Sequence, residues 1–310
     1  MDQSETRFAW NGDVALAYQV VGSGEHDLLY LPGFMSNIDV MWEWPPYERF
    51  LRRLSSFARL ILMDRRGYGC SERYAPDAVA PLEVLVDDAL VVLDAAEASK
   101  AAVFAFEEAT FLAVLLAAAR PERVSHLVLQ TPTASFMSNE ELPWEWTSEQ
   151  WEEQLALFRR TWGITSPEHR AEDQRMLAEQ GRPDEFDEHE FRWLHKMERA
   201  TMGPGALVAE TRKFMDIDVR SVLPTIHVPT LVLHRRGAAL YDARSSRYVA
   251  DHIVGATYVE VDSGMDSWPL DGGVGGGRRR DRGVRRRHAA RSRAEPDLED
   301  RVVHRHRRIE

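Results

Sequence analysis

The chain has 310 residues, of which 44% are apolar and one is a cysteine, and its formal net charge is −11. This length suits one large α/β domain with an insertion or two small domains, and the lone Cys70 excludes an internal disulfide framework. No apolar run reaches the roughly 18 residues that a membrane span needs, and the polar first residues lack the features of a secretory signal. We therefore expect a cytoplasmic protein with no membrane span.

The charge is divided unevenly along the chain. Residues 271–310 contain 13 Arg, no Lys and 7 acidic residues, a net charge of +6, which leaves −17 for residues 1–270. Because phosphate contacts need clustered Lys and Arg, the acidic body predicts no nucleic-acid partner. Residues 271–310 also lack hydrophobic periodicity and a plausible core, which predicts a disordered basic tail.

The N-terminal third alternates extended and helical patterns. Thr6–Trp10 and Val14–Val20 alternate apolar and polar residues around Asn11-Gly12, which predicts an antiparallel hairpin. Strand, helix and strand then follow one another with short connections, which predicts a mainly parallel sheet flanked by helices. The expected strands are Asp27–Leu31, Arg59–Met63, Ala101–Phe106 and Val124–Leu129, and the expected helices are Tyr47–Leu54, Pro81–Ala96 and Thr110–Ala119.

From residue 132 to residue 219 the strand pattern stops and helical signals dominate. Thr147 and Gln150 predict a capping box in front of an apolar stripe, and Ser166-Pro167 predicts a second helix start. We expect two further helices here, and then a return of the sheet pattern. These helices are Phe186–Thr201 and Gly205–Met215, and the sheet resumes with strands Thr230–Leu233 and Thr257–Val261 around a helix at Ser245–Ile253.

Four motifs resemble those of the α/β-hydrolase family and occur in the family's order over about residues 6–270. They are LPGF at Leu31–Phe34, DRRGYGCS at Asp64–Ser71, the strand–turn–helix–strand segment Val103–Leu129, and PTLVLHRRG at Pro229–Gly237. The resemblance implies an α/β-hydrolase fold with a helical cap. We therefore predict a hydrolase core in two parts, 1–131 and 220–270, a cap at 132–219 and the tail at 271–310.

The resemblance also locates the residues of a catalytic triad. It places the nucleophile at Glu107, the acid at Ala238 and the histidine at Ser267, and it places the two oxyanion-hole N–H groups at Phe34 and Glu108. A serine hydroxyl must lose its proton to a neighbouring imidazole as it attacks, and neither group is present at these positions. The sequence therefore predicts a degenerate triad and a hydrolase-like pseudoenzyme.

Two substitutes for the missing groups remain open. Asp242 follows Ala238 by four residues and could replace the acid. Glu107 could itself attack, as Asp does in the dehalogenases and epoxide hydrolases of this fold, although Glu is longer and those enzymes need the absent His to release the ester. The usual elbow glycines are also replaced, by Ala105 and Ala109, whose methyl groups are expected to crowd a strained turn.

The cap region offers weaker functional signals. Its tryptophans either line a pocket for a small hydrophobic ligand or pack the cap onto the sheet. They are Trp144, Trp146, Trp151 and Trp162. His169, His189 and His195 are also in the cap, but the spacing of six between His189 and His195 does not match one helix face, so we expect no metal site and no cofactor.

The basic tail is consistent with a change of reading frame. With suitable third codon letters, Glu299–Ile309 read one nucleotide later gives KTVLFTDIVGS, and Asp281–Val284 gives IEEF. The first segment resembles the opening strand of class III adenylate or guanylate cyclases, and the second resembles the missing last helix of the hydrolase fold. The parent gene is thus expected to encode a bacterial hydrolase-like domain fused to a cyclase domain.

Three functional hypotheses follow. The first is a non-catalytic module that senses a ligand or regulates the fused cyclase. The second is an active esterase, epoxide hydrolase or dehalogenase with unorthodox residues. The third is a decayed gene product without a function, and the fold alone does not separate the three.

Overall fold

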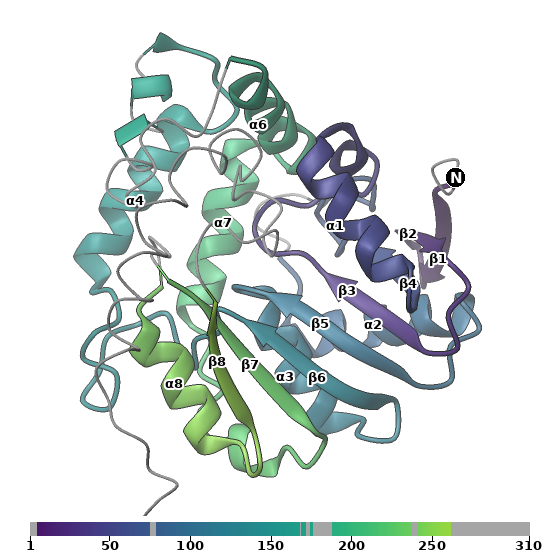
Figure 1. The fold of residues 1–310 in the computed structure, drawn as a ribbon. Helices are drawn as coiled ribbons and strands as arrows, with labels where there is room; N and C mark the ends of the chain where they lie inside the picture. Colours follow the sequence, from purple (N-terminus) through teal and green to yellow (C-terminus); the bar gives the residue numbers. More distant parts are fainter. Residues whose placement is uncertain are drawn as a thin grey trace, which may run out of the picture. The chain divides into compact units, whose positions relative to one another are not determined.

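The computed structural model describes residues 5–74, 79–167, 169–171, 174–175, 188–236 and 241–261. Within them, eight strands form one sheet in the order β1-β2-β4-β3-β5-β6-β7-β8 (Figure 1). β2 pairs antiparallel with β1 and β4, and all other neighbouring strands are parallel. The strands are β1 (Arg7–Asn11), β2 (Val14–Val21), β3 (Asp27–Leu31), β4 (Arg59–Met63), β5 (Ala101–Phe106), β6 (Val124–Gln130), β7 (Thr230–Arg235) and β8 (Thr257–Val261).

Helices cover the sheet from two sides. The buried apolar residues of α2 (Leu82–Ala95), α3 (Ala109–Ala119) and α8 (Ala243–His252) join one hydrophobic core cluster. Those of α1 (Pro45–Ser55) join a second cluster together with residues of β3, β4 and β5. Because parallel strands are buried on both faces, their sequences are nearly continuous apolar runs, which explains why they could be found in the sequence.

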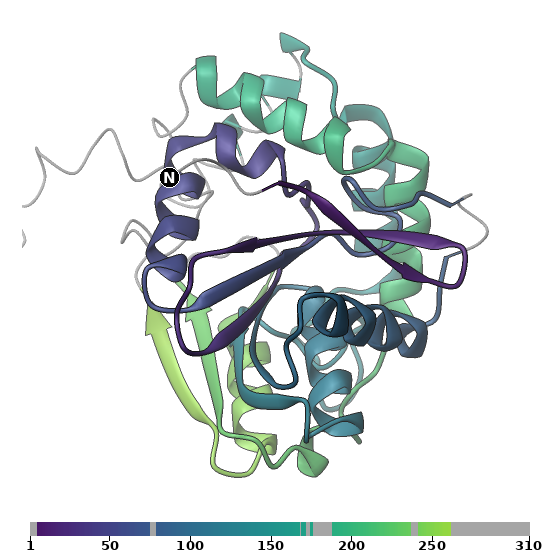
Figure 2. The ribbon, with the colours of Figure 1, turned by 90° about the vertical axis from the view of Figure 1, so that its right-hand side faces the viewer.

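An insertion between β6 and β7 contains α4 (Ser148–Thr161), α6 (Glu188–Thr201) and α7 (Pro204–Met215), and we call these three helices the helical insertion. They lie together at the top of Figures 1 and 2, on one side of the sheet. The expected capping box at the start of α4 is confirmed, because Thr147 and Gln150 exchange side-chain and backbone hydrogen bonds. Two 3₁₀ turns complete the described elements, η1 (Val40–Glu43) and η2 (Leu223–Thr225).

The predicted elements agree with the structure to within about two residues, with one difference in the first hairpin. The prediction put the turn at Asn11-Gly12, but Asn11 still pairs with Val14, so the two turn residues are Gly12 and Asp13. Gly12 has φ +62°, a backbone conformation that glycine adopts without strain. The tail at 271–310 lies outside the described residues, and the proposed domain boundaries stay predictions.

One sheet face is open near β7 and β8. On β7, Val232 and His234 are buried towards α8, so Leu231 and Leu233 point the other way and are only partly buried. Val259 of β8 lies beside Leu233 and is 40% exposed. Among the described residues this face therefore presents apolar side chains that are partly open to solvent.

Candidate functional site

The turn between β5 and α3 keeps the geometry of a nucleophile elbow. Glu107 follows the last residue of β5 and has φ +50°, a left-handed conformation that is uncommon for a residue other than glycine. Its N–H donates to the carbonyl of Gln130 at 2.9 Å, and its carbonyl accepts from the N–H of Thr110 at 3.0 Å. A sharp strand-to-helix turn of this kind presents the side chain at its apex, as in the α/β hydrolases.

The two alanines beside the elbow do not crowd it as expected. Ala105 and Ala109 are completely buried in the core, and neither has a positive φ. Glycine is required where a turn needs a left-handed backbone, and in this turn only Glu107 carries that conformation. The strain of the elbow is therefore concentrated at Glu107.

Glu107 lies in a small cavity between the elbow and α6. The cavity has a volume of about 40 Å³, enough for a few water molecules. It is lined by Tyr30, Gly33, Phe34, Met35, Tyr47, Glu107, Trp193 and Met197. Burial raises the pKa of Glu107 to about 7, and the charge of Arg235 opposes this change. The Glu107 carboxyl thus titrates near neutral pH inside a mainly aromatic cavity.

Asp64, which directly follows β4, stabilises the loop that is expected to supply one oxyanion-hole N–H at Phe34. The Asp64 carboxylate accepts hydrogen bonds from the backbone N–H groups of Ile38 at 3.1 Å and Cys70 at 2.8 Å, and from the Ser36 hydroxyl. A methyl group at Gly69 would lie 2.1 Å from an Asp64 oxygen, so only glycine fits there. These contacts explain the spacing of the DRRGYG motif and fix the segment that follows Phe34.

Carboxyl groups occupy the space beside this loop. A methyl group at Gly33 would lie 3.1 Å from a Glu107 oxygen and 3.2 Å from a Glu108 oxygen. Glu108 is completely buried and forms an ion pair with Arg65, at 2.5 Å from Nη2. Burial raises the pKa of Glu108 to about 8 although the charge of Arg65 opposes the change.

A buried polar cluster surrounds the ion pair, and we define it as Arg65, Tyr68, Glu108, Glu210 and Tyr241. Each member has at least one buried polar atom without a hydrogen-bond partner among the described residues. The Arg65 guanidinium lies 4.2 Å from the centre of the Tyr68 ring, and burial raises the pKa of Glu210 to about 7. Buried polar atoms in native proteins are nearly always hydrogen-bonded, so we expect these atoms to bond water.

The other predicted triad positions, Ala238 and Ser267, lie outside the described residues. Asp242, the possible substitute acid, caps the start of α8 by accepting from the N–H of Arg244 at 2.8 Å, and it also pairs with the Arg244 guanidinium at 2.7 Å. No hydrogen bond joins Glu107 to a histidine in the part of the chain that the structure describes. The buried ring of His234 instead bonds the Ser246 hydroxyl at 3.0 Å.

Three of the tryptophans named from the sequence form hydrogen bonds that hold the region of the helical insertion together or join it to α8. Trp151 donates to the carbonyl of Phe136 and Trp162 to the carbonyl of Met202, both at 2.9 Å, and Trp144 donates to the Ser245 hydroxyl at 3.1 Å. These contacts support the packing interpretation. Trp146 lines a wider, open cavity of about 480 Å³ along α4.

The elbow cavity instead uses aromatic residues that the sequence did not single out. Tyr30 is in a strand and Tyr47 is in a helix, where both match ordinary core positions. Trp193 comes from α6, and its indole N–H donates to the carbonyl of Val40 at 3.1 Å. The sequence around these residues looks like that of ordinary core residues. They meet at the elbow because of the order of the strands in the sheet and the position of the helical insertion.

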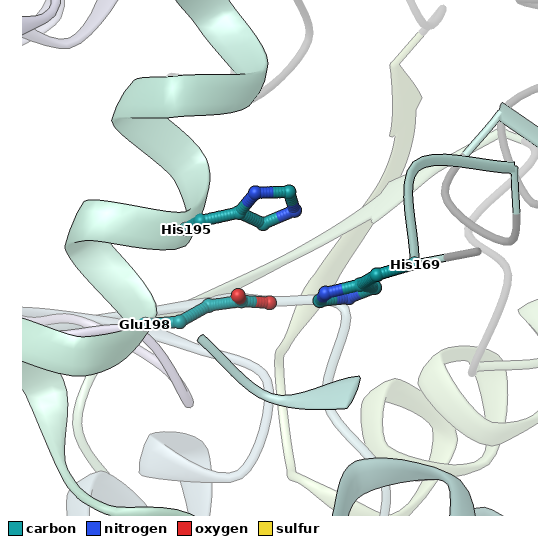
Figure 3. Close-up of side chains that lie close together, drawn as sticks. All are labelled: His169, His195 and Glu198. Carbon is teal, nitrogen blue, oxygen red and sulfur yellow. The ribbon is translucent and has the colours of Figure 1, made fainter. Parts of the chain in front are cut away.

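The structure also brings together His169, His195 and Glu198, which lie close to one another in the helical insertion (Figure 3). The sequence prediction considered His189 as the neighbour of His195 and expected no metal site. In the structure the neighbour of His195 is His169, whose ring is stacked on that of His195 at a centroid distance of 4.5 Å. His169 and His195 are 26 positions apart in the sequence, so no helical spacing predicts their contact.

Comparisons with known proteins agree with this architecture. A family model described as alpha/beta hydrolase fold matches residues 28–178. The pimeloyl-[acyl-carrier protein] methyl ester esterase of Nitrosomonas europaea is 24% identical over 243 residues, which cover 78% of this chain and 88% of that protein. No helix among the described residues is long and apolar enough to cross a membrane.

Solved structures of hydrolases superpose on most of the chain. The enol-lactonase from Burkholderia xenovorans LB400 has a TM-score of 0.61 at 21% identity, and the match covers 82% of this chain and 91% of that one. The esterase from Exiguobacterium antarcticum has a TM-score of 0.67 at 20% identity, over 82% and 89% of the two chains. With the sheet order and the left-handed elbow, these matches establish that the chain has the α/β-hydrolase fold.

Proposed function

We propose that this domain is a non-hydrolytic α/β-hydrolase-fold module that binds a small, mainly apolar ligand at the elbow cavity and regulates an attached partner. The observation that carries the proposal is Glu107, a carboxyl group at the left-handed position where the fold presents its nucleophile. The elbow is formed, but its side chain has no hydroxyl proton to lose to a base.

The charges around the cavity also oppose ester hydrolysis. An oxyanion hole stabilises a developing negative charge with N–H groups. Here two carboxyl groups with pKa values of about 7 and 8 lie beside Gly33. Above these pH values an ionised carboxylate about 4 Å from an oxyanion raises its energy by about 4 kcal/mol at an effective dielectric constant of 20. The site therefore favours neutral or cationic groups over a developing anion.

The lining of the cavity indicates the chemistry of the ligand. Its walls are mainly aromatic and apolar, and the hydroxyl groups of Tyr30 and Tyr47 in the lining bond each other at 2.7 Å. The Glu107 carboxyl can donate or accept a hydrogen bond near its pKa of about 7. A volume of about 40 Å³ is far below the roughly 300–1,000 Å³ of typical small-molecule sites. In our proposal a ligand displaces Trp193 and Met197, and with them α6, so that binding changes the position of the helical insertion.

The partner that we propose is a class III nucleotide cyclase domain encoded in the parent gene. The support for it is the shifted reading of Glu299–Ile309, which resembles the first strand of such cyclases. The nucleotide sequence of the gene tests this part alone. Codons that cannot give the cyclase motif one nucleotide later would refute it and would leave the proposal for the elbow cavity unaffected.

Two assays test the elbow proposal. The first offers the protein a panel of acyl esters that includes methyl esters, because one relative is a methyl ester esterase. We expect no turnover above the protein-free rate. The second is a thermal-shift screen of small apolar alcohols, amines and amides, in which a ligand of the folded state raises the melting temperature. We expect this shift to change in Glu107→Gln and to persist in the control Glu122→Gln, which alters an exposed acid far from the elbow in the sequence.

A second candidate function is hydrolysis with Glu107 as a carboxylate nucleophile. The observation in its favour is the raised pKa of this cavity carboxyl, because perturbed pKa values cluster at functional sites. In that reaction Glu107 attacks a carbon atom of an epoxide or haloalkane and forms an ester bond to it. With an epoxide, one C–O bond of the ring breaks, and the oxygen stays on the neighbouring carbon and takes up a proton from water; with a haloalkane, the carbon–halogen bond breaks and the halide leaves. Mass spectrometry after incubation detects such an ester on Glu107. Turnover or ester formation that is lost in Glu107→Gln would overturn the non-hydrolytic proposal.

A further inference from the structure

Three buried side chains of the helical insertion form a cluster of potential metal ligands. His169, His195 and Glu198 each place one ligand atom within 4.8 Å of the others. Their exposed fractions are 4%, 1% and 6%. His195 and Glu198 are three residues apart on α6 and therefore share one face of that helix. Figure 3 shows His169 reaching towards them from the segment that follows α4.

A glycine turn holds the ligands of this cluster in place. Gly163 has φ +72°, its N–H donates to Glu198 Oε2 at 2.9 Å, and its carbonyl accepts from Arg199 Nη1 at 2.5 Å. A methyl group at Gly163 would lie 2.5 Å from Arg199 Cγ, so a larger residue would separate the turn from α6. The turn thus fixes one oxygen of Glu198, and Figure 3 shows the side chain of Glu198 extending from α6 towards His169.

The same turn sets the tautomer of His169. Nδ1 of His169 lies 2.6 Å from the carbonyl oxygen of Ile164. Because a carbonyl only accepts, Nδ1 carries the proton and Nε2 is the ring atom that can bind a metal. A histidine that donates its other ring N–H to a backbone carbonyl is the usual second-shell arrangement around protein-bound metals.

We propose that His169, His195 and Glu198 bind a divalent transition-metal ion, with Zn²⁺ as the expected occupant. Two imidazoles and one carboxylate are a known donor set for Zn²⁺. Zinc–ligand bonds of about 2.1 Å place tetrahedral ligand atoms about 3.4 Å apart, so the cluster needs a contraction of about 1.4 Å at most.

The metal connects the segment after α4 to α6. This helix also supplies Trp193 and Met197 to the elbow cavity. An occupied site therefore stabilises the helical insertion around that cavity. The inference rests only on the cluster, and it holds whether or not the proposed ligand-binding function is correct.

The test uses the full chain without a polyhistidine tag, stripped with EDTA and dialysed. Three tail histidines, His288, His304 and His306, are replaced by Gln in the reference protein because they could bind metal independently. Isothermal titration with ZnCl₂ is expected to give one site per chain. At a hundredfold excess over the dissociation constant the melting temperature should rise by about 5 °C. Co²⁺ should give the intense visible absorption of a tetrahedral site.

Matched variants locate the site. His195→Gln and Glu198→Gln are each expected to weaken Zn²⁺ binding at least a hundredfold. His189→Gln, which changes an exposed histidine of the same helix, should leave binding unchanged. Because a variant can lower stability by itself, each variant is titrated below its own melting temperature, and its melting shift is measured against its EDTA-treated form. Absence of the single site in the reference protein, or equal affinities in His195→Gln and His189→Gln, would overturn the proposal.

Discussion

Replacing Glu107 by Gln should stabilise the domain above neutral pH and leave it unchanged in mild acid. The folded state raises the pKa of Glu107 from 4.5 to about 7, mainly through burial. Between these two values the folded chain binds more protons than the unfolded chain, so the free energy of unfolding falls as the pH rises from about 4.5 to 7. The loss is complete above pH 7 and is absent below the unfolded pKa.

The magnitude follows from the same two values. A difference of about 2.5 in pKa corresponds to about 3 kcal/mol, and the partial exposure of the side chain lowers the expected effect to about 2 kcal/mol. Gln has nearly the same shape and no charge, so Glu107→Gln should raise the free energy of unfolding by about 2 kcal/mol at pH 8 and by almost nothing at pH 4.5. The exposed control Glu122→Gln should change it little at either pH.

Urea unfolding followed by tryptophan fluorescence at pH 4.5, 6, 7 and 8 measures both variants against the unmodified chain. The difference between Glu107→Gln and the unmodified chain should grow between pH 4.5 and pH 7 and change little from pH 7 to pH 8. A difference that is the same at every pH, or a variant that is less stable at pH 8, would refute the argument that Glu107 is held in a site that disfavours its charge.

The remaining predictions concern other contacts. Arg65→Met should lower the free energy of unfolding, measured in urea, by about 3–5 kcal/mol, because it leaves Glu108 buried without its partner. The double variant Arg65→Met/Glu108→Leu should lose clearly less, and an equal loss in the single and double variants would contradict the pairing. Glu97 follows the end of α2 and has φ +56°, a conformation that glycine adopts without strain. Glu97→Gly should therefore raise the free energy of unfolding by about 1 kcal/mol in the same assay, and a lower value would contradict this account of the helix end. Val259→Thr should reduce self-association in light scattering with little change in melting temperature, because this side chain lies on the open sheet face; unchanged association would assign the contact to another surface.

The fold could be predicted from the sequence because its signals are local. Runs such as Arg59–Met63 and Ala101–Phe106 are mainly apolar and predict buried strands, and the capping box at Thr147 predicts the start of a helix. The elbow could be placed as well, because its strand–turn–helix order leaves one position for the apex. The structure gives that position, Glu107, the left-handed φ that the motif requires.

Contacts between distant segments had no such signal. Arg65 and Glu108 are 43 positions apart and meet because β3 lies between β4 and β5 in the sheet. His169 lies beside His195 because the turn at Gly163 packs on α6. Side-chain chemistry at such points depends on tertiary packing, whereas sequence periodicity reports only which face of an element is buried.

The Arg65–Glu108 pair argues against simple decay of the elbow. A buried carboxylate without a partner destabilises a domain by several kcal/mol, which is a large part of the 5–15 kcal/mol that holds a typical domain together. Glu108 is completely buried, so it is tolerated only with Arg65 beside it, and Arg65 in turn needs Glu108. The pair, together with the strained turn at Glu107, therefore supports the proposal of a binding site at the elbow.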